Sequence, residues 1–159
     1  MQILLKSCKI VSPNSPFHGK TKDILIIDGV IDKIEGTIND KVDQTFSHDN
    51  LHVSIGWYDA CVDFCDPGFE IKEDLISGLK SAEAGGMTAV SITPNTSPSL
   101  SNKSQIEYVL NNSSFSPVDI YPFGTITEQL KGEELAELFD LSKAGAIAFS
   151  DYKSDVSAG

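Results

Sequence analysis

Residues 57–70, WYDACVDFCDPGFE, alternate cysteine with aspartate inside an apolar run. In an extended strand, side chains point alternately to two faces, so Asp59, Cys61, Asp63 and Cys65 would share one inward face. Thiolates and carboxylates both bind Zn²⁺, although this row would need further ligands from elsewhere. A free cysteine is more often a small buried apolar residue, and the residues alone leave both interpretations open.

A disulfide between Cys61 and Cys65 is excluded if the segment is extended. Four residues of strand separate two Cα atoms by about 13 Å, whereas a disulfide requires roughly 4.4 to 6.8 Å. The spacing also lacks the C-x-x-C pattern of redox proteins. Cys8 brings the total to three, an odd number that favours free thiols in a cytoplasmic protein.

The composition is that of an acidic globular chain. Its 159 residues include 12 Lys+Arg and 23 Asp+Glu, which give a net charge of −11. Nucleic acid and anionic membrane surfaces are therefore not expected as partners. No apolar run reaches the roughly 20 residues that a membrane-spanning helix requires.

The sequence predicts two regions with different patterns. Residues 1–54 predict an antiparallel β unit, with strands at 2–11 and on both sides of Asp28-Gly29, and a polar connection over 39–50. Residues 55–159 predict strands and helices that alternate, which indicates βαβ units and a parallel sheet. The expected strands are 51–64, 87–95, 118–127 and 146–151, and the expected helices are 72–86, 102–112 and 131–145.

An open doubly wound sheet and a closed barrel both fit this alternation. The segment after the first parallel strand, DPGFEIKED, is not the glycine-rich G-x-G-x-x-G loop of dinucleotide-binding proteins. An eight-stranded barrel typically needs about 250 residues, so a barrel would make this chain a truncated one.

Residues 53–109 resemble the dihydroorotases of the amidohydrolase superfamily. That family reads V-S-P-G-x-x-D-x-H-x-H-x-R-E-P-G, then K-E-x-x-x-x-G, G-G-x-T-x-V and M-P-N-T-x-P. Residues 121–151 are similar to its third and fourth strands, which end in A-F-[ST]-D-D-G. The matching positions keep their spacing without a gap, and they include Asp59, Pro67, Gly68, Lys72, Glu73, Gly78, Gly85, Gly86, Thr88, Val90, Pro94, Asn95, Thr96 and Pro98.

The resemblance implies the fold. It predicts that residues 1–54 contribute to a small flanking β-sandwich and that residues 55–159 form the first half of a (β/α)8 TIM barrel. It also implies the family activity, the metal-dependent interconversion of dihydroorotate and carbamoyl aspartate in pyrimidine biosynthesis. Active family members use zinc.

The site residues depart from the family pattern. Cys61 and Asp63 stand where the two histidine ligands are expected, and Cys65 replaces the arginine that grips the substrate carboxylate. Tyr152 replaces the aspartate that bridges two metals, while the substrate-contacting asparagine is kept as Asn95. A thiolate and a carboxylate add negative charge that weakens the Lewis acidity of a bound metal, and cysteine cannot form the bidentate clamp of arginine.

These departures predict a degenerate site, with metal positions at Cys61, Asp63 and Tyr152, substrate positions at Asn95 and Cys65, and neither a catalytic residue nor a cofactor. The resulting hypothesis is a catalytically impaired homologue that acts as a structural or regulatory partner of a carbamoyltransferase-type protein, and we also expect a homo-oligomer. The alternative is an active metal-dependent hydrolase of a cyclic amide with a rearranged metal site.

Overall fold

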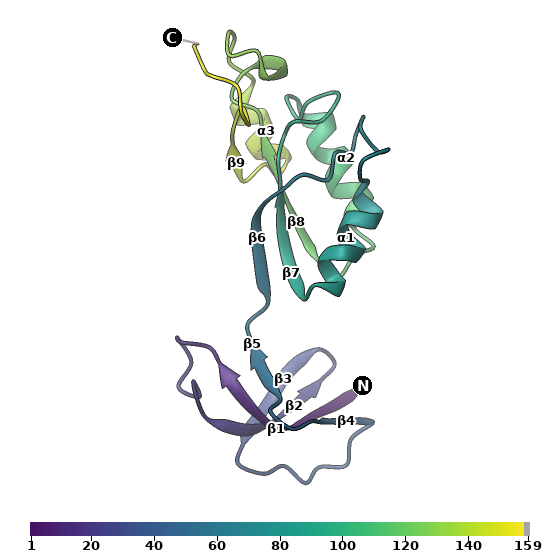
Figure 1. The fold of residues 1–159 in the computed structure, drawn as a ribbon, viewed down its shortest axis with the longest axis vertical. Helices are drawn as coiled ribbons and strands as arrows, with labels where there is room; N and C mark the ends of the chain where they lie inside the picture. Colours follow the sequence, from purple (N-terminus) through teal and green to yellow (C-terminus); the bar gives the residue numbers. More distant parts are fainter. Residues whose placement is uncertain (158–159) are drawn as a thin grey trace. The chain divides into compact units, whose positions relative to one another are not determined.

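The computed structural model describes residues 1–157, which separate into two compact units (Figure 1). The first unit is Met1–Ile55 and the second begins at Gly56. Among residues 1–157, no helix has the length and apolar character needed to cross a membrane.

The first unit contains a five-stranded sheet in the order β3-β2-β1-β4, with β5 also paired to β1. β2 is antiparallel to both β1 and β3, as predicted, whereas β4 and β5 run parallel to β1. The prediction of a wholly antiparallel unit was therefore wrong. The strands are β1 (Gln2–Val11), β2 (Thr21–Ile27), β3 (Val30–Glu35), β4 (Gln44–Ser47) and β5 (His52–Ser54).

β4 lies inside the segment that was predicted to be a polar connection. All four of its residues, Gln44 to Ser47, are exposed. Because neither face of β4 is buried, its sequence lacks the alternation of apolar and polar residues that would predict a strand. Its position depends on pairing with β1, which is distant in sequence. Within residues 1–55 the structure contains one sheet, and the β-sandwich stays a prediction.

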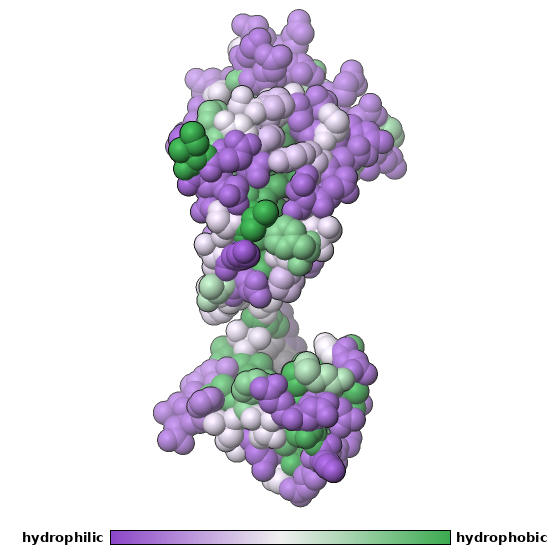
Figure 2. All heavy atoms as spheres, turned by 90° about the vertical axis from the view of Figure 1, so that its right-hand side faces the viewer, coloured by the Kyte–Doolittle hydropathy of each residue, from purple (hydrophilic) through white to green (hydrophobic). Residues whose placement is uncertain are grey.

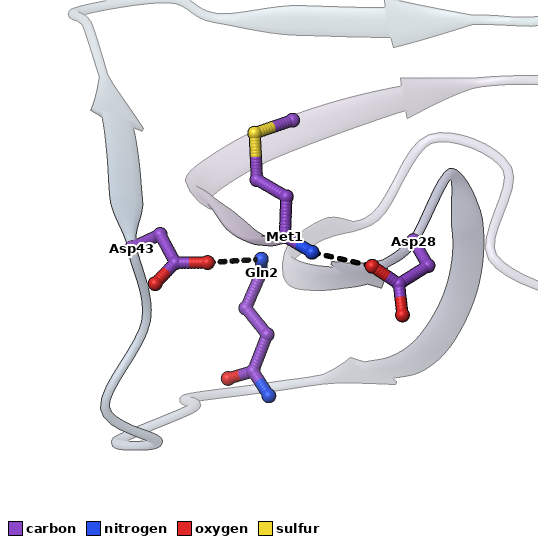
Figure 3. A network of polar contacts seen from close by, with 4 residues as sticks. All are labelled: Met1, Gln2, Asp28 and Asp43. Carbon is purple, nitrogen blue, oxygen red and sulfur yellow. Dashed lines mark hydrogen bonds and ion pairs between the residues drawn. The ribbon is translucent and has the colours of Figure 1, made fainter.

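Aspartates hold the turns of the first unit. Figure 3 shows the Met1 amine paired with the Asp28 carboxylate, and the Gln2 backbone N–H donating to Asp43 Oδ2 at 2.7 Å. A third aspartate, Asp23, is buried and accepts the backbone N–H groups of Ser7 and Ile38 at 2.8 and 2.9 Å. Asp23 thereby satisfies the amide of Ser7, which lies in the irregular step of the β1–β2 ladder between Leu5 and Cys8, and the amide of Ile38, which lies after β3.

The second unit confirms the predicted α/β class. Its parallel strands follow the order β6-β7-β8-β9, and a helix lies in each connection. The strands are β6 (Trp57–Val62), β7 (Met87–Ile92), β8 (Asp119–Gly124) and β9 (Ala148–Phe149); the helices are α1 (Leu75–Ala84), α2 (Lys103–Ser113) and α3 (Leu138–Ala144), with the 3₁₀ helix η1 (Glu128–Leu130) before α3.

The predicted strand over 51–64 is in fact two strands. His52–Ser54 pairs with β1 in the first unit, and Trp57–Val62 pairs with β7 in the second. Ile55 and Gly56 between them are exposed and belong to neither sheet. The continuous apolar run concealed this break, because hydrophobicity does not indicate which sheet a residue joins.

Local signals fixed the ends of α1 and α2. Asp74 caps α1 through the backbone N–H of Ser77, and Asn102 does the same for α2 through the backbone N–H of Gln105. Ile71 lies ahead of α1 and is fully exposed, so it adds nothing to the buried face of the helix.

α3 is shorter than predicted. It was expected over 131–145, yet it begins at Leu138 and ends, as expected, at Gly145 in a left-handed conformation. Residues 131–137 form an irregular loop in which Gly132 has a φ of +74°. One buried cluster joins all three helices to β7 and β8: Leu75, Leu79, Val90, Ile92, Leu100, Ile106, Val109, Val118, Ile120, Ala136, Leu141 and Ala146.

Candidate functional site

A β-bulge in β6 changes which face its side chains occupy. Asp59 lies opposite Val90 and Val62 lies opposite Ile92, so three steps along β6 match two along β7. Val90 and Ile92 face the helices, and Asp59 shares that side, where it lines a small cavity beside α1. The prediction that Asp59 shares a face with Cys61, Asp63 and Cys65 was therefore wrong, because a bulge reverses the alternation.

The other residues of the predicted row lie at the end of β6. The strand ends at Val62, so Asp63 and Cys65 belong to the following loop. Cys61 is exposed and Cys65 is half-buried, so neither is a buried apolar filler. All three cysteines of the chain, including the buried Cys8, are free thiols.

Asp63 is the acceptor for three side chains from different segments. Asn95 Nδ2 donates to Asp63 Oδ2 at 3.0 Å, and the Tyr152 hydroxyl approaches the same oxygen at 3.5 Å. Cys65 Sγ lies 3.4 Å from the other oxygen, Oδ1. Asn95 follows β7 and Tyr152 follows β9, so these residues meet at the carboxyl edge of the parallel sheet, where barrel enzymes place their chemistry.

Cys61 stands apart from this group. Its backbone N–H donates to Asp59 Oδ1 at 3.1 Å, and within residues 1–157 its thiol makes no hydrogen bond to Asp63, Asn95 or Tyr152. Of the five positions singled out in the sequence, the structure thus joins Asp63, Cys65, Asn95 and Tyr152 and leaves Cys61 outside.

The Cys65 thiol is a hydrogen-bond donor in this group. Burial raises its pKa above the usual value, and the hydrogen bond to Asp63 and the negative charge of that carboxylate raise it further. The thiol therefore stays protonated at neutral pH. A metal ligand must be the thiolate, so the raised pKa opposes the binding of a cation by Cys65.

The residues of this group do not fit the zinc centre of active dihydroorotases. Residues 1–157 contain no group of three or more His, Cys, Asp and Glu side chains arranged to hold a metal. The amide of Asn95, the phenol of Tyr152 and the thiol of Cys65 each present a hydrogen to Asp63, where a cation would require lone pairs. The three histidines of the sequence all lie in residues 1–55.

Asp151, directly before Tyr152, has a different environment. It is buried and accepts the backbone N–H groups of Ile126 and Thr127 at 2.8 and 3.0 Å, together with the Thr127 hydroxyl. Thr127 Oγ1 in turn accepts the N–H of Gly132 at 2.8 Å. Asp151 therefore fixes the loop after β8, a role that the sequence did not predict.

A second buried aspartate lies next to Cys65. Asp66 accepts the backbone N–H of Leu75 at 3.1 Å and the hydroxyl of Tyr108 at 2.9 Å, so it joins the start of α1 to α2. Burial raises the pKa of Tyr108, and the hydrogen bond to Asp66 raises it further.

A polar cavity of about 440 Å³ lies between the loops that follow β7 and β8. It is lined by hydroxyl and amide side chains and one carboxylate, among them Ser101, Gln105, Glu128 and Gln129. None of the site residues predicted from the sequence lines it.

Comparisons with known proteins agree with this fold. A family model described as dihydro-orotase-like matches residues 52–158. The dihydroorotase of Ruminiclostridium cellulolyticum is 37% identical over 152 residues, which cover 95% of this chain and 35% of the relative. The dihydroorotase of Syntrophotalea carbinolica is 39% identical over 160 residues, covering 100% of this chain and 37% of the relative. The chain thus spans little more than a third of the length of these relatives.

Solved structures show the same arrangement of elements. The L-hydantoinase (dihydropyrimidinase) of Arthrobacter aurescens superposes with a TM-score of 0.73 at 21% identity, over 92% of this chain and 32% of the other. A dihydroorotase superposes with a TM-score of 0.61 at 17% identity, over 93% and 41%. At such identities the likeness shows the fold alone. Because the family model covers more than half of the chain, in the same frame as the sequence motifs and the parallel sheet, the chain belongs to the dihydroorotase-like family.

Proposed function

We propose that this dihydroorotase-like chain does not catalyse the hydrolysis of a cyclic amide, and that it acts as a structural or regulatory partner. The observation that carries the proposal is the environment of Asp63. This side chain stands at a position where the family pattern has a metal ligand, and it accepts hydrogen bonds from Asn95, Cys65 and Tyr152.

The chemistry of the family explains why these neighbours matter. In active members, a metal centre activates water for attack on the amide carbonyl and stabilises the oxyanion that forms. Cys65, at the arginine position, offers a protonated thiol that carries no positive charge for a substrate carboxylate. Asn95 could still donate to a substrate, yet its Nδ2 is engaged by Asp63. Residues 61–65 therefore lack the histidine ligands that would hold a metal to activate water, and they lack the arginine that would bind the substrate carboxylate.

The activity test uses the full-length protein. We expect no conversion of dihydroorotate to carbamoyl aspartate above the buffer background, either as purified or after incubation with Zn²⁺, and no stoichiometric zinc by elemental analysis. An active dihydroorotase assayed in parallel is the positive control. Conversion that a chelator abolishes would refute the proposal and support the alternative, an active hydrolase with a rearranged metal site.

The partner role is a separate part of the proposal. Large apolar side chains on the second unit, including Trp57, Ile76 and Phe139, are more than half exposed, and apolar groups interrupt the hydrophilic surface in Figure 2. Such side chains favour association with another protein surface. We propose a carbamoyltransferase-type partner and a homo-oligomeric state.

Light scattering coupled to size-exclusion chromatography tests both associations. We expect a mass above that of one chain for the protein alone, and a larger complex when an aspartate carbamoyltransferase from the same organism is added. Trp57→Ser is the matched variant for the apolar surface. A monomer that elutes separately from the carbamoyltransferase would refute the partner role without affecting the activity proposal.

A further inference from the structure

We propose that Asp63 is the centre of a hydrogen-bonded tether that joins the carboxyl ends of the parallel strands at the position where active relatives hold a metal. The proposed function describes this site only as inactive, and the tether gives it a structural role in holding the strand ends together. Asp63 can have this role only if, as in the proposed function, no cation occupies the position.

The contacts of Asp63 connect three strand ends. Asp63 directly follows β6, its partner Asn95 is 32 residues away after β7, and its partner Tyr152 is 89 residues away after β9. Contacts over such separations fix the relative positions of segments that the chain itself leaves free. Cys65, two residues from Asp63, adds a local contact that holds the turn after β6.

The fourth strand end joins through the neighbouring residue. Asp151 binds the loop after β8 through the N–H groups of Ile126 and Thr127, and it is covalently linked to Tyr152. Residues 151 and 152 therefore extend two side chains from one turn, one to the β8 loop and one to Asp63. Two carboxylates thus connect the ends of β6, β7, β8 and β9 in one continuous set of contacts.

The residue types suit a tether better than a cation site. An ionised carboxylate only accepts hydrogen bonds and can accept several at once. The groups that surround Asp63 donate an amide, a hydroxyl and a thiol hydrogen. Asp63 itself is exposed, so each contact contributes modestly and the effect depends on their combination.

Thermal unfolding of the full-length protein tests the tether. Asp63→Ala and Asp63→Asn are compared with Asp119→Asn, an exposed aspartate in β8 whose side chain makes no hydrogen bond with residues 1–157. We expect both Asp63 variants to lower the midpoint by about 3 °C and the control to change it by less than about 1 °C. Zinc chloride and EDTA should leave the wild-type midpoint unchanged.

Hydrogen exchange of backbone amides distinguishes a local effect near Asp63 from a general loss of stability, which would speed exchange throughout the second unit. In Asp63→Ala, the amides of residues 93–97 and 150–153 should exchange several times faster, while those of α1 keep their wild-type rates. Asn95→Ala should speed exchange at residues 93–97 alone, because it breaks only the contact between Asn95 and Asp63. Adding Asn95→Ala to Asp63→Ala should change these rates little, since Asp63→Ala already removes that contact.

The outcomes separate this inference from the proposed function. Wild-type midpoints and exchange rates in the Asp63 variants would overturn the tether even if the protein proves inactive. A midpoint that rises with zinc in the wild type but not in Asp63→Ala would also overturn it, since Asp63 would then be a metal ligand. Chelator-sensitive hydrolysis alone would instead overturn the proposed function.

Discussion

Asp151 and Asp63 lie at the same edge of the parallel sheet, and their surroundings differ in two respects. Asp151 is 3% exposed and two of its three donors are backbone N–H groups, whereas Asp63 is exposed and all its donors are side chains. A buried carboxylate that satisfies backbone amides determines the path of a loop. An exposed carboxylate that binds side chains leaves no buried backbone amide without a partner when it is changed.

This difference explains how the family motif A-F-[ST]-D-D-G could change here. The first aspartate is kept as Asp151, whose removal would leave buried amides of Ile126 and Thr127 without partners. The second is replaced by Tyr152, which stands on the site side of the same turn and contacts Asp63. The position that holds the loop after β8 is retained, and the position for which the resemblance predicts a metal-bridging aspartate is not.

Asp66 is intermediate between the two. It is 8% exposed and accepts one backbone N–H, from Leu75, and one side-chain hydroxyl, from Tyr108. The contribution of an aspartate to stability should follow the number of buried backbone N–H groups that it accepts. Substitution of Asp66 should then lower the free energy of unfolding by an amount between the losses at Asp151 and at Tyr152.

The largest effect is expected for Asp151→Ala. The substitution leaves two backbone N–H groups and the Thr127 hydroxyl without their acceptor, so the free energy of unfolding should fall by about 3 kcal/mol. Urea denaturation measures it, with the exposed Asp155→Ala as the control. A loss no larger than that of the control would remove the distinction between buried and exposed carboxylates.

Asp66→Ala should lower the free energy of unfolding by about 2 kcal/mol, because one buried acceptor is lost at the start of α1 while the Tyr108 hydroxyl can turn to water. The same denaturation experiment with Asp119→Ala as control measures it. If the free energy of unfolding falls as much as in Asp151→Ala, it makes no difference to stability whether a buried aspartate accepts from backbone N–H groups or from a side-chain hydroxyl.

The pair of Asp66 and Tyr108 should also make stability depend on alkaline pH. The folded state raises the pKa of Tyr108 above 10.0, chiefly by burial, so it holds the phenol proton more tightly than the unfolded chain does. The resulting stabilisation is complete below about pH 10 and is lost as the pH rises through the raised pKa. Tyr108→Phe should unfold with a weaker dependence on pH between about 9 and 11. Identical pH profiles would contradict this assignment.

The smallest effect is expected for Tyr152→Phe. The hydroxyl lies 3.5 Å from Asp63, at the outer limit of a hydrogen bond, so its loss should cost less than about 0.5 kcal/mol. The phenylalanine ring keeps the packing of Lys153, which lies 4.8 Å from the ring centroid. Urea denaturation measures the change. A fall in the free energy of unfolding close to that of Asp66→Ala would show that the exposed contacts of Asp63 stabilise the fold as much as those of the buried aspartates.

The sequence predicted the elements whose signals are local. α1 and α2 have their capping residues, apolar spacing and terminal positions within about 15 residues, and the structure confirms them. The hairpin at Asp28-Gly29 was predicted for the same reason. The resemblance to dihydroorotases also followed from residue types at fixed spacing, and the family is confirmed.

Elements that depend on distant contacts were missed or misplaced. β4 exists because it pairs with β1, and the late start of α3 coincides with a loop held by Asp151 through Thr127 and Gly132. The bulge in β6, which moved Asp59 to the helix side, is a mismatch between two strands and has no signature in one of them.

The sequence by itself determined which side chains stand at positions 61, 63, 65, 95 and 152, and therefore that the imidazoles and the arginine of the family pattern are replaced there. Only the tertiary structure decided that Asp63 gathers Asn95 and Tyr152 while Cys61 remains outside, and that Asp151 is buried. The physical reason is that a hydrogen bond depends on distance and direction between atoms, and residues 63 and 152 are brought together only when the strands pair.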